Sequence, residues 1–208
     1  MRRVSQEISL QNERILEVAI QQFCEKGYAK TRMEDIAQIL DITKTPLYYH
    51  FKDKAGLFDA AFRKAINNLY TNDAVIFAKN CCLYEKLVES FVTCAISSHQ
   101  LQIDEMSRIL VKEGAELSRT YTYQQEMQDR FYALKTAAMR DAQQRGEVKP
   151  DADIDELYAI INACYTGVLS WVGGEELRRK FAPGESERLM QHLIGTIYSA
   201  IKPLYFVA

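Results

Sequence analysis

Apolar side chains recur along this chain at intervals of three and four residues, which is the spacing of amphipathic α-helices. The first such stripe runs from Leu16 to Phe23, and Gly27 follows it as a stop signal. We therefore expect the first helix over roughly residues 10–26.

The next two stripes are short and closely spaced. Thr31 and Glu34 have the spacing of a capping box, so a second helix is expected from there to Leu40. After a break at residues 41–43, a third helix is expected over residues 44–51. Two short helices joined by so tight a turn are typical of a helix-turn-helix.

The residues at the start of the third helix suit that position. Thr43 is expected to cap the helix, with its hydroxyl accepting the N–H of Thr45. Pro46 falls in the first turn, where its missing N–H would have had no partner inside the helix. Proline is therefore compatible with a helix here.

Beyond this point the pattern predicts longer helices. Asp53 is expected to cap a fourth helix, whose apolar stripe begins at Phe58 and runs to about Phe77, joining the N-terminal module to the rest. Further helices are expected at about residues 83–98, 103–116, 121–145, 152–173 and 185–202, separated by residues 80–82, 100–102, 118–120, 146–151 and 173–184. No strand pattern of useful length is present, so the chain is predicted to be all-α.

Composition agrees with a helical globular protein. The 208 residues are 48% hydrophobic, and 9 glycines and 4 prolines leave little material for the turns of a many-stranded sheet protein. A net charge of −2 excludes a polybasic protein that coats nucleic acid, yet residues 1–64 carry +2 and residues 65–208 carry −4. A modestly basic N-terminal module thus precedes an acidic remainder.

The sequence gives no sign of secretion, membrane insertion or metal binding. The N-terminus lacks an apolar signal region, and the most apolar stretch, residues 159–172, is too short and too interrupted to span a bilayer. Five cysteines without Cys-x-x-Cys spacing encode neither a disulfide framework nor a zinc site, and the pattern at Cys81 and Cys82 favours inert thiols over a redox switch. We expect a soluble cytoplasmic protein with no metal and no cofactor.

The helix expected over residues 152–173 is apolar around most of its circumference, so it must be buried on two sides. One side carries small residues that suit the close approach of a partner helix: Ala159, Ala163, Gly167 and Ser170. The last helix adds a second apolar seam through Leu189, Leu193 and Ile197, with Ala200 or Ile201. We therefore expect a homodimer through residues 152–173 and 185–202.

The densest functional cluster surrounds the third helix. If Leu47 and Phe51 are buried, the side chains left outside can donate to phosphates and touch base edges: Lys44, Thr45, Tyr48, Tyr49 and His50. Packing of Tyr48 and His50 between helices is the alternative interpretation. Lys52 and Lys54 can equally be ordinary solvated charges.

At these residues the sequence resembles the tetracycline-repressor-like (TetR) family of transcriptional regulators. The resemblance covers residues 14–62, including Gly27-Tyr28, Thr31 to Ala37 and Leu47-Tyr48-Tyr49-His50-Phe51, whereas the later chain resembles the family in helix count and in residues 146–153. The resemblance implies a nine-helix, two-domain fold, with a DNA-binding domain over residues 1–52 and a ligand-binding and dimerisation domain over residues 53–208. It also implies a homodimer and a small-molecule effector. Because a dimer has two-fold symmetry, the double-stranded DNA operator is expected to be pseudo-palindromic.

Carried over by position, the family pattern assigns residues to the two parts of DNA. Those expected in the major groove are Lys44, Thr45, Pro46 and Tyr49, and those expected at phosphates are Thr31, Arg32, Thr43, Tyr48, His50 and Lys54. Asp41 departs from the family, because many members have glycine in this turn and aspartate tolerates the left-handed region less well.

A partly apolar effector is expected within the C-terminal helices. The residues expected to hold it are Phe62, Ile66, Phe91, Met127, Phe131, Asn162 and Tyr165. No nucleophile–base pair, glycine-rich phosphate loop or metal-ligand spacing is present, so no catalytic residue and no enzyme activity are expected. The leading hypothesis is a ligand-released repressor, and the alternative is an architectural or protein-interaction role without an effector.

Overall fold

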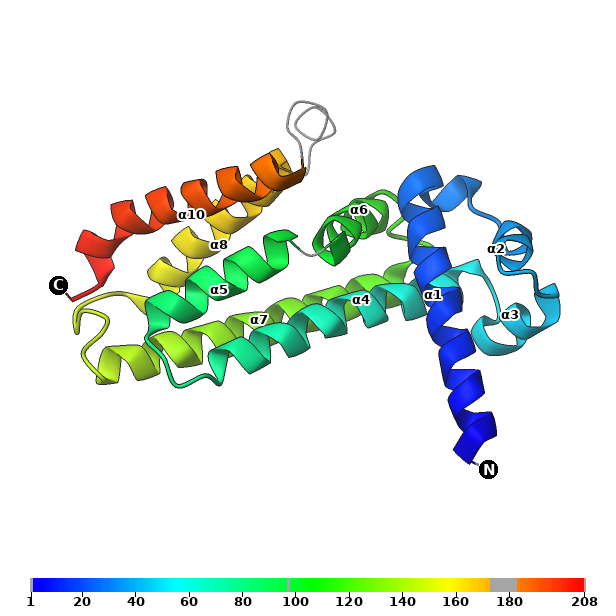
Figure 1. Ribbon diagram of the computed structural model, residues 1–208, viewed down its shortest axis with the longest axis horizontal. Coiled ribbons are helices and arrows are strands. Elements are labelled where there is room, and N and C mark those ends of the chain that lie inside the picture. Colours follow the sequence, from blue (N-terminus) through cyan, green and yellow to red (C-terminus); the bar gives the residue numbers. More distant parts are fainter. Residues whose placement is uncertain (1, 97, 173–182, 208) are drawn as a thin grey trace. The chain divides into compact units, whose positions relative to one another are not determined.

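Nine α-helices lie within residues 2–96, 98–172 and 183–207, which are the residues that the computed structural model describes (Figure 1). They are α1 (Arg2–Lys30), α2 (Met33–Ile39), α3 (Lys44–Phe51), α4 (Lys54–Phe77), α5 (Leu83–Ile96), α6 (Ser98–Lys112), α7 (Ser118–Gln144), α8 (Ile154–Val172) and α10 (Pro183–Tyr205). Within these ranges the extended pairing is confined to one isolated antiparallel bridge, between Val148 and Phe206. The expected all-α fold is confirmed.

The chain forms two compact units. Unit 1 contains Met1–Asn68 and Gln102–Met127, and unit 2 contains Leu69–Leu101 and Gln128–Ala208. The helices α4 and α7 each contribute their first part to unit 1 and their second part to unit 2. Each unit is therefore completed by segments that are distant in the sequence.

Aromatic rings join α1 to α4 in the core of unit 1. The ring centroid of Phe58 lies 5.0 Å from that of Phe23 and 5.7 Å from that of Tyr28, and all three side chains are buried. Gly27 has φ of 76° and ψ of 165°, a conformation open to glycine, and it interrupts the regular helix just before Tyr28. The predicted stop at Gly27 is confirmed, while α1 begins earlier than expected, at Arg2.

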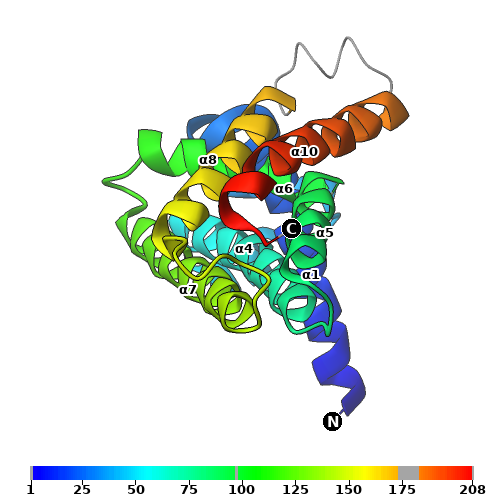
Figure 2. The same ribbon diagram turned by 90° about the vertical axis from the view of Figure 1, so that its left-hand side faces the viewer.

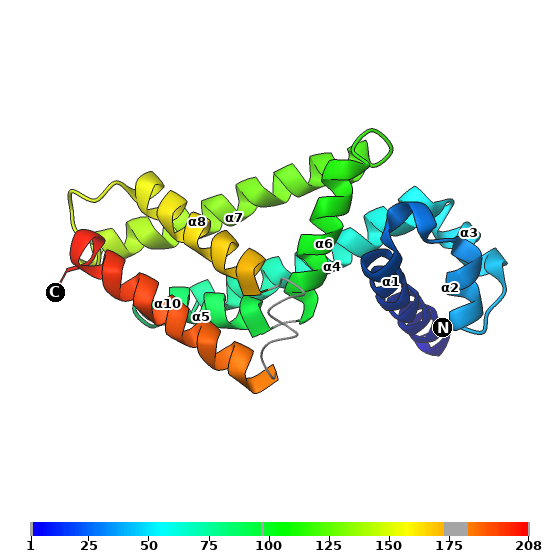
Figure 3. The same ribbon diagram turned by 90° about the horizontal axis from the view of Figure 1, so that it is seen from above.

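A Schellman motif ends α2 and sets the turn before α3. Both helices belong to unit 1, where α2 lies beside α1 and α3 (Figure 3). The Ile42 N–H donates to the Ala37 carbonyl at 3.0 Å, and the Asp41 N–H donates to the Gln38 carbonyl at 3.2 Å. Asp41 has φ of 53° at the position where glycine is usual. The strain expected at Asp41 therefore has a structural basis.

The junction of α3 and α4 is a still tighter turn. Lys52 has φ of 64° and ψ of −53°, and the Asp53 N–H donates to the Phe51 carbonyl at 2.8 Å, which is a strained γ-turn. The Asp53 carboxylate then accepts the Gly56 N–H at 2.7 Å, so the predicted cap of α4 is confirmed. Gly56 packs so close to this turn that an added Cβ would lie 2.1 Å from the Phe51 oxygen.

In unit 2, α5, α8 and α10 lie side by side (Figure 2). Their shared core includes Leu87, Leu157, Ile194 and Tyr198, all buried. A reciprocal cap starts α5: the Glu85 N–H donates to the Cys82 sulfur at 3.5 Å, and the Cys82 N–H donates to the Glu85 carboxylate at 3.2 Å. Cys82 therefore has a structural role as the cap of α5, and this role needs no redox chemistry.

The chain after α10 is tied to the segment between α7 and α8. The Lys149 N–H donates to the Tyr205 carbonyl at 2.8 Å, and the Val207 N–H donates to the Glu147 carbonyl at 3.0 Å. The Lys149 ammonium also donates to the Pro203 carbonyl at 2.6 Å. The last turn of α10 is thereby fixed to a loop some fifty positions earlier in the sequence.

Two expected loops are wrong. Residues 100–102 lie inside α6, and residues 118–120 form the first turn of α7. Polar residues at these positions resemble loop signals, although glutamine is a good helix former and serine is favoured near a helix start. The actual turn lies at residues 113–117, and the expected loop at 173–184 falls mostly outside the described residues.

Candidate nucleic-acid interface

One side of α3 is buried and the other is exposed and polar. Leu47 is fully buried, whereas Tyr49 keeps 81% of its surface exposed. The same helix exposes Lys44, Thr45, Tyr48 and His50, with Pro46 half-buried. The structure therefore brings the residues expected at the major groove onto one accessible helix.

Tyr48 is held by a residue for which the sequence predicts a different role, that of a capping-box carboxylate. Its hydroxyl donates to the Glu34 carboxylate of α2 at 3.1 Å. The Glu34 carboxylate accepts its own backbone N–H and the Tyr48 hydroxyl, and these bonds hold the pKa of Glu34 below its usual value. The same bond raises the pKa of Tyr48, so the pair is an anion and a neutral phenol at neutral pH. The two residues are fourteen positions apart, and no local pattern signals the contact.

Thr31 does not form the predicted capping box. It is buried, and its hydroxyl donates to the Gln22 carbonyl at 3.1 Å and to the Gly27 carbonyl at 2.8 Å. Arg32 occupies the N-cap position of α2 and makes no side-chain cap hydrogen bond. The Thr31 hydroxyl therefore closes the break at Gly27, and its side chain has almost no exposed surface for a phosphate.

Thr43 is the N-cap residue of α3, as predicted, with extended φ of −71° and ψ of 157°. The expected hydrogen bond from the Thr45 N–H is wrong, because the Thr43 side chain makes no cap bond. Both Thr43 and Arg32 are exposed. Their polar groups are thus accessible at the N-termini of α2 and α3.

Lys54 lies at the start of α4 and contacts Tyr28. Its ammonium donates to the Tyr28 carbonyl at 3.0 Å and lies 4.2 Å from the centroid of the Tyr28 ring. The Tyr28 hydroxyl donates to Glu116 at 2.7 Å, and burial together with this bond raises the pKa of Tyr28 well above its usual value. Lys54 therefore already has partners inside unit 1.

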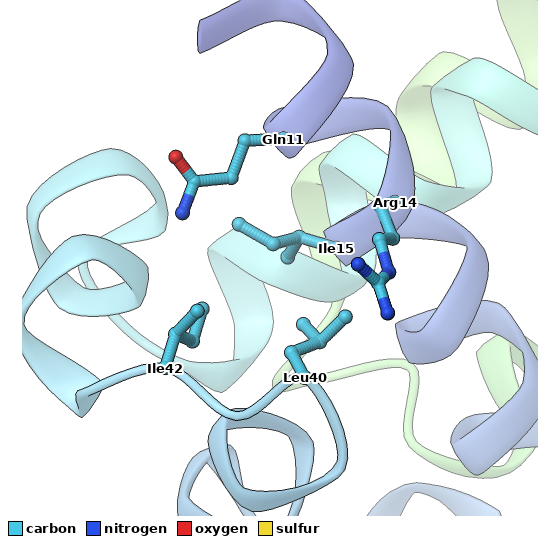
Figure 4. A pocket seen from close by; sticks show the side chains of 5 residues that line it. All are labelled: Gln11, Arg14, Ile15, Leu40 and Ile42. Atoms are coloured by element: carbon cyan, nitrogen blue, oxygen red, sulfur yellow. The ribbon is translucent and has the colours of Figure 1, made fainter. Parts of the chain in front are cut away.

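A recess of about 340 Å³ lies between α1 and the α2–α3 turn (Figure 4). Ile15, Leu40 and Ile42 form its apolar wall, and Gln11 and Arg14 stand beside them. Ile15 and Leu40 are buried, so the wall belongs to the helix-turn-helix core. The recess exposes a cation, Arg14, on the same unit as α3.

The residues expected to hold an effector fall in both units. Phe62, Ile66 and Met127 are buried in unit 1, and Phe91, Phe131, Asn162 and Tyr165 belong to unit 2. In unit 2 the rings of Phe91 and Tyr165 meet edge to face, with centroids 4.8 Å apart. Asn162 is exposed on α8, and its main-chain carbonyl accepts the Thr166 hydroxyl.

The small-residue side of α8 is exposed within this single chain. Ala159, Ala163 and Gly167 all lie on the surface, and an added Cβ at Gly167 would meet no atom within 4 Å. Ser170 has a side chain outside the described residues. On α10, Leu193 and Ile197 are half-buried.

Neither a metal site nor a membrane span is found among the described residues. No group of three histidine, cysteine, aspartate or glutamate side chains in this part of the chain is arranged to hold a metal ion. None of the described helices has the length and apolar character needed to cross a membrane. Cys24, a free thiol, has its pKa raised by burial to about 12.

Comparison with known proteins matches residues 15–61 to the family described as bacterial regulatory proteins, tetR family. The transcriptional repressor KstR2 of Mycobacterium tuberculosis is 25% identical over 167 residues, which cover 77% of this chain and 80% of KstR2. The matched family segment runs from α1 through α3 into α4, and so contains the whole exposed helix described above.

Solved structures share the fold over nearly the whole chain. A TetR transcriptional regulator from Chloroflexus aurantiacus has a TM-score of 0.77 at 20% identity, covering 98% of this chain and 100% of that one. A transcriptional regulator from Saccharomonospora viridis in complex with choline has a TM-score of 0.74 at 20% identity, covering 96% and 100%. At this identity the likeness concerns the fold.

Proposed function

The chain belongs to the TetR family of bacterial regulatory proteins and is a DNA-binding transcriptional regulator rather than an enzyme; from this premise we propose that it is a homodimeric repressor, released from its operator by a small molecule. The exposed polar side of α3 carries the proposal. KstR2, a relative across most of the chain, is a repressor by its name. We place the action of the present chain in the cytoplasm, where the chromosome is accessible.

We assign two roles to the exposed residues around α3. Lys44, Thr45, Pro46 and Tyr49 would read base edges in the major groove, since Lys44 and Thr45 are exposed at the start of α3 and Tyr49 keeps 81% of its surface exposed. Phosphates would be contacted from the flanks by Arg32, Thr43, Tyr48, His50 and Lys54. Thr31 is left out, because its hydroxyl is committed inside unit 1.

Selection of binding sites from random duplex DNA tests this assignment. The wild-type protein should recover a pseudo-palindrome, because a two-fold dimer presents two equivalent recognition helices. Lys44→Ala and Tyr49→Ala should each cost about 1–3 kcal/mol at defined base positions and relax the preference there. Tyr121→Ala is the matched control, since Tyr121 is a tyrosine of α7 with 41% of its surface exposed.

The outcomes separate regulation from the alternative roles. Uniform weakening across every site variant would mean that Lys44 and Tyr49 contact the backbone only. Recovery of no preferred sequence, together with dispersed occupancy on the genome, would favour the architectural role instead. Loss of affinity in Tyr121→Ala would mean that the assay reports folding rather than contact.

Dimerisation is proposed through α8 and α10. The exposed small residues of α8 allow a second helix to approach closely, and α10 adds half-buried apolar side chains beside it. In a monomer these positions face water, which a partner copy would exclude. Two copies of α3 must then lie about 34–36 Å apart, or a multiple of that distance, to enter successive major grooves.

The effector is proposed to act through α4. This helix begins directly after the Asp53 cap that follows α3, and it continues as one helix from unit 1 into unit 2. A molecule bound in unit 2 that changes the tilt of α4 would change the spacing of the two recognition helices. It must bind the released state more tightly than the DNA-bound state, because equal affinity shifts no equilibrium. DNA must then weaken effector binding by the same factor.

A further inference from the structure

Unit 2 contains a buried ion pair that DNA binding does not use. Asp73 of α4 is buried, and its carboxylate accepts the Ser90 hydroxyl of α5 at 2.6 Å. The other carboxylate oxygen lies 3.1 Å from the ammonium of Lys135 on α7. A buried pair costs so much desolvation that apolar residues often replace it without loss of stability. Stability alone therefore gives no reason for charges at this meeting of three helices.

The two partners differ in how far a second molecule can reach them. The Asp73 side chain is 2% exposed and the Lys135 side chain is 16% exposed. Asp73 uses one oxygen for Ser90 and one for Lys135, whereas an ammonium carries three N–H donors. Lys135 is therefore the member of the pair that can still donate to an incoming acceptor.

Two aromatic rings lie close to the lysine. Its ammonium lies 5.5 Å from the ring centroid of Tyr165 and 5.7 Å from that of Phe131, and both rings are half-buried. Behind them, Phe91 packs edge to face on Tyr165, and Tyr70 packs edge to face on Phe131 with centroids 5.3 Å apart. One partly accessible cation thus lies beside a cluster of aromatic rings from α4, α5, α7 and α8.

We propose that Lys135, held in place by Asp73, binds the carboxylate of an apolar carboxylic acid, and that such acids are the effector class. This proposal depends on the effector-released repressor described above and names its ligand. A cationic ligand is disfavoured, because Lys135 already occupies the place beside the carboxylate and the rings. A neutral ligand would gain only a weaker hydrogen bond, since bonds to charged partners are the stronger ones.

Calorimetric titration of the full-length protein with matched probes tests the proposal. The probes are decanoate and phenylbutyrate as carboxylates, with decanol and phenylbutanol as neutral counterparts and decylamine as the cation. The carboxylates should bind about tenfold to a hundredfold more tightly than their alcohols, the difference expected for a hydrogen bond to a charged group.

Two variants tie this preference to the pair. In the double variant Asp73→Asn with Lys135→Met both charges are removed together, so no charge is left buried without a partner and the fold is retained. Its preference for carboxylates over alcohols should disappear. Lys86→Met is the control, because Lys86 is also a buried lysine of unit 2 but donates to the Phe77 carbonyl at 3.0 Å. Its preference should stay as in the wild type.

Several results would overturn the proposal: equal affinity for acids and alcohols, no binding of either acid, tighter binding of the amine, or an unchanged preference in the double variant. Operator binding is measured in parallel. Release of the operator by a molecule without a carboxylate would overturn this inference and leave the repressor function standing. Carboxylate binding without any operator binding would overturn the repressor function and leave the carboxylate site at Lys135 standing.

Discussion

Gly56→Ala should weaken operator binding although it changes no residue that faces DNA. An alanine Cβ at this position would lie 2.1 Å from the Phe51 carbonyl oxygen and 3.3 Å from an Asp53 carboxylate oxygen. Close carbon–oxygen contacts are about 3.3 Å, so the first contact is about 1 Å too short. The Phe51 oxygen is fixed, because it accepts the Asp53 N–H in the γ-turn. The last turn of α3 must therefore move away from α4.

The short contact with the Phe51 oxygen decides whether Gly56→Ala stabilises or destabilises the protein. Alanine gains at most about 1 kcal/mol over glycine in a helix, whereas forcing an extra methyl group into a packed site typically costs about 1–3 kcal/mol. For a chain of this size each kcal/mol lowers the melting temperature by about 2–4 °C. If α3 shifts so that even one good base contact no longer forms, operator binding should weaken about tenfold.

Thermal unfolding and a fluorescence anisotropy titration on the selected operator measure the two effects. Gly114→Ala is the matched control: it lies in the turn of unit 1 before α7, and an added Cβ would lie 3.4 Å from the Leu110 oxygen, an ordinary contact. That variant should match or slightly exceed the wild type in stability. If Gly56→Ala melts and binds DNA like the wild type, the tight packing of α3 on α4 does not control the recognition helix.

Four further outcomes follow from the same structure. Asp41→Gly should stabilise the protein by about 0.5–1 kcal/mol in thermal unfolding, because glycine adopts φ of 53° without a Cβ penalty; an unchanged midpoint would mean that aspartate is unstrained there. Gly167→Arg should leave a monomer in sedimentation velocity, since it puts a charge on the exposed side of α8, and a persisting dimer would move the interface elsewhere. Lys54→Ala should lower the slope of log affinity against log salt by roughly 1 for each phosphate that the lysine neutralises. An unchanged slope would mean that Lys54 contacts Tyr28 and no phosphate. Burial opposes ionisation of Glu147, but the Leu83 N–H and the Arg145 guanidinium outweigh it and hold the pKa of Glu147 below its usual value. The stability that the ionised carboxylate contributes is therefore lost as the pH falls through that pKa. Glu147→Gln should reduce this loss of stability below about pH 4.5 in unfolding measurements.

Periodic and local signals carry most of the fold. The bounds of α3, the start of α4 after Asp53 and its end at Phe77 match the expected ones, because the apolar stripe of α4 and its capping residue agree. The loops expected at residues 100–102 and 118–120 are wrong, because polar residues do not break a helix where tertiary packing allows it to continue.

The site is predictable only in part. Exposure of Tyr49 follows from the burial of Leu47 on the opposite side of one short helix, and Lys44 is exposed as the first residue of that helix. Thr31 shows the limit: its hydroxyl bonds the carbonyls of Gln22 and Gly27, and that choice depends on the backbone conformation at Gly27 rather than on spacing. The pair of Asp73 and Lys135 joins positions far apart in the chain, which one sequence cannot bring together.

The bonds that tie Val207 and Tyr205 to the loop before α8 bear on the order in which the protein folds during synthesis. Unit 1 has all of its residues once Met127 has left the ribosome, so the part that carries α3 can close early. Unit 2 is complete only after Tyr205 and Val207 have been synthesised, because they pair with Lys149 and Glu147. Until they emerge, the apolar side chains of α5 and α8 lack α10 and are open to non-native association. Nascent chains stalled before residue 205 should therefore show a protease-resistant unit 1 and a sensitive unit 2.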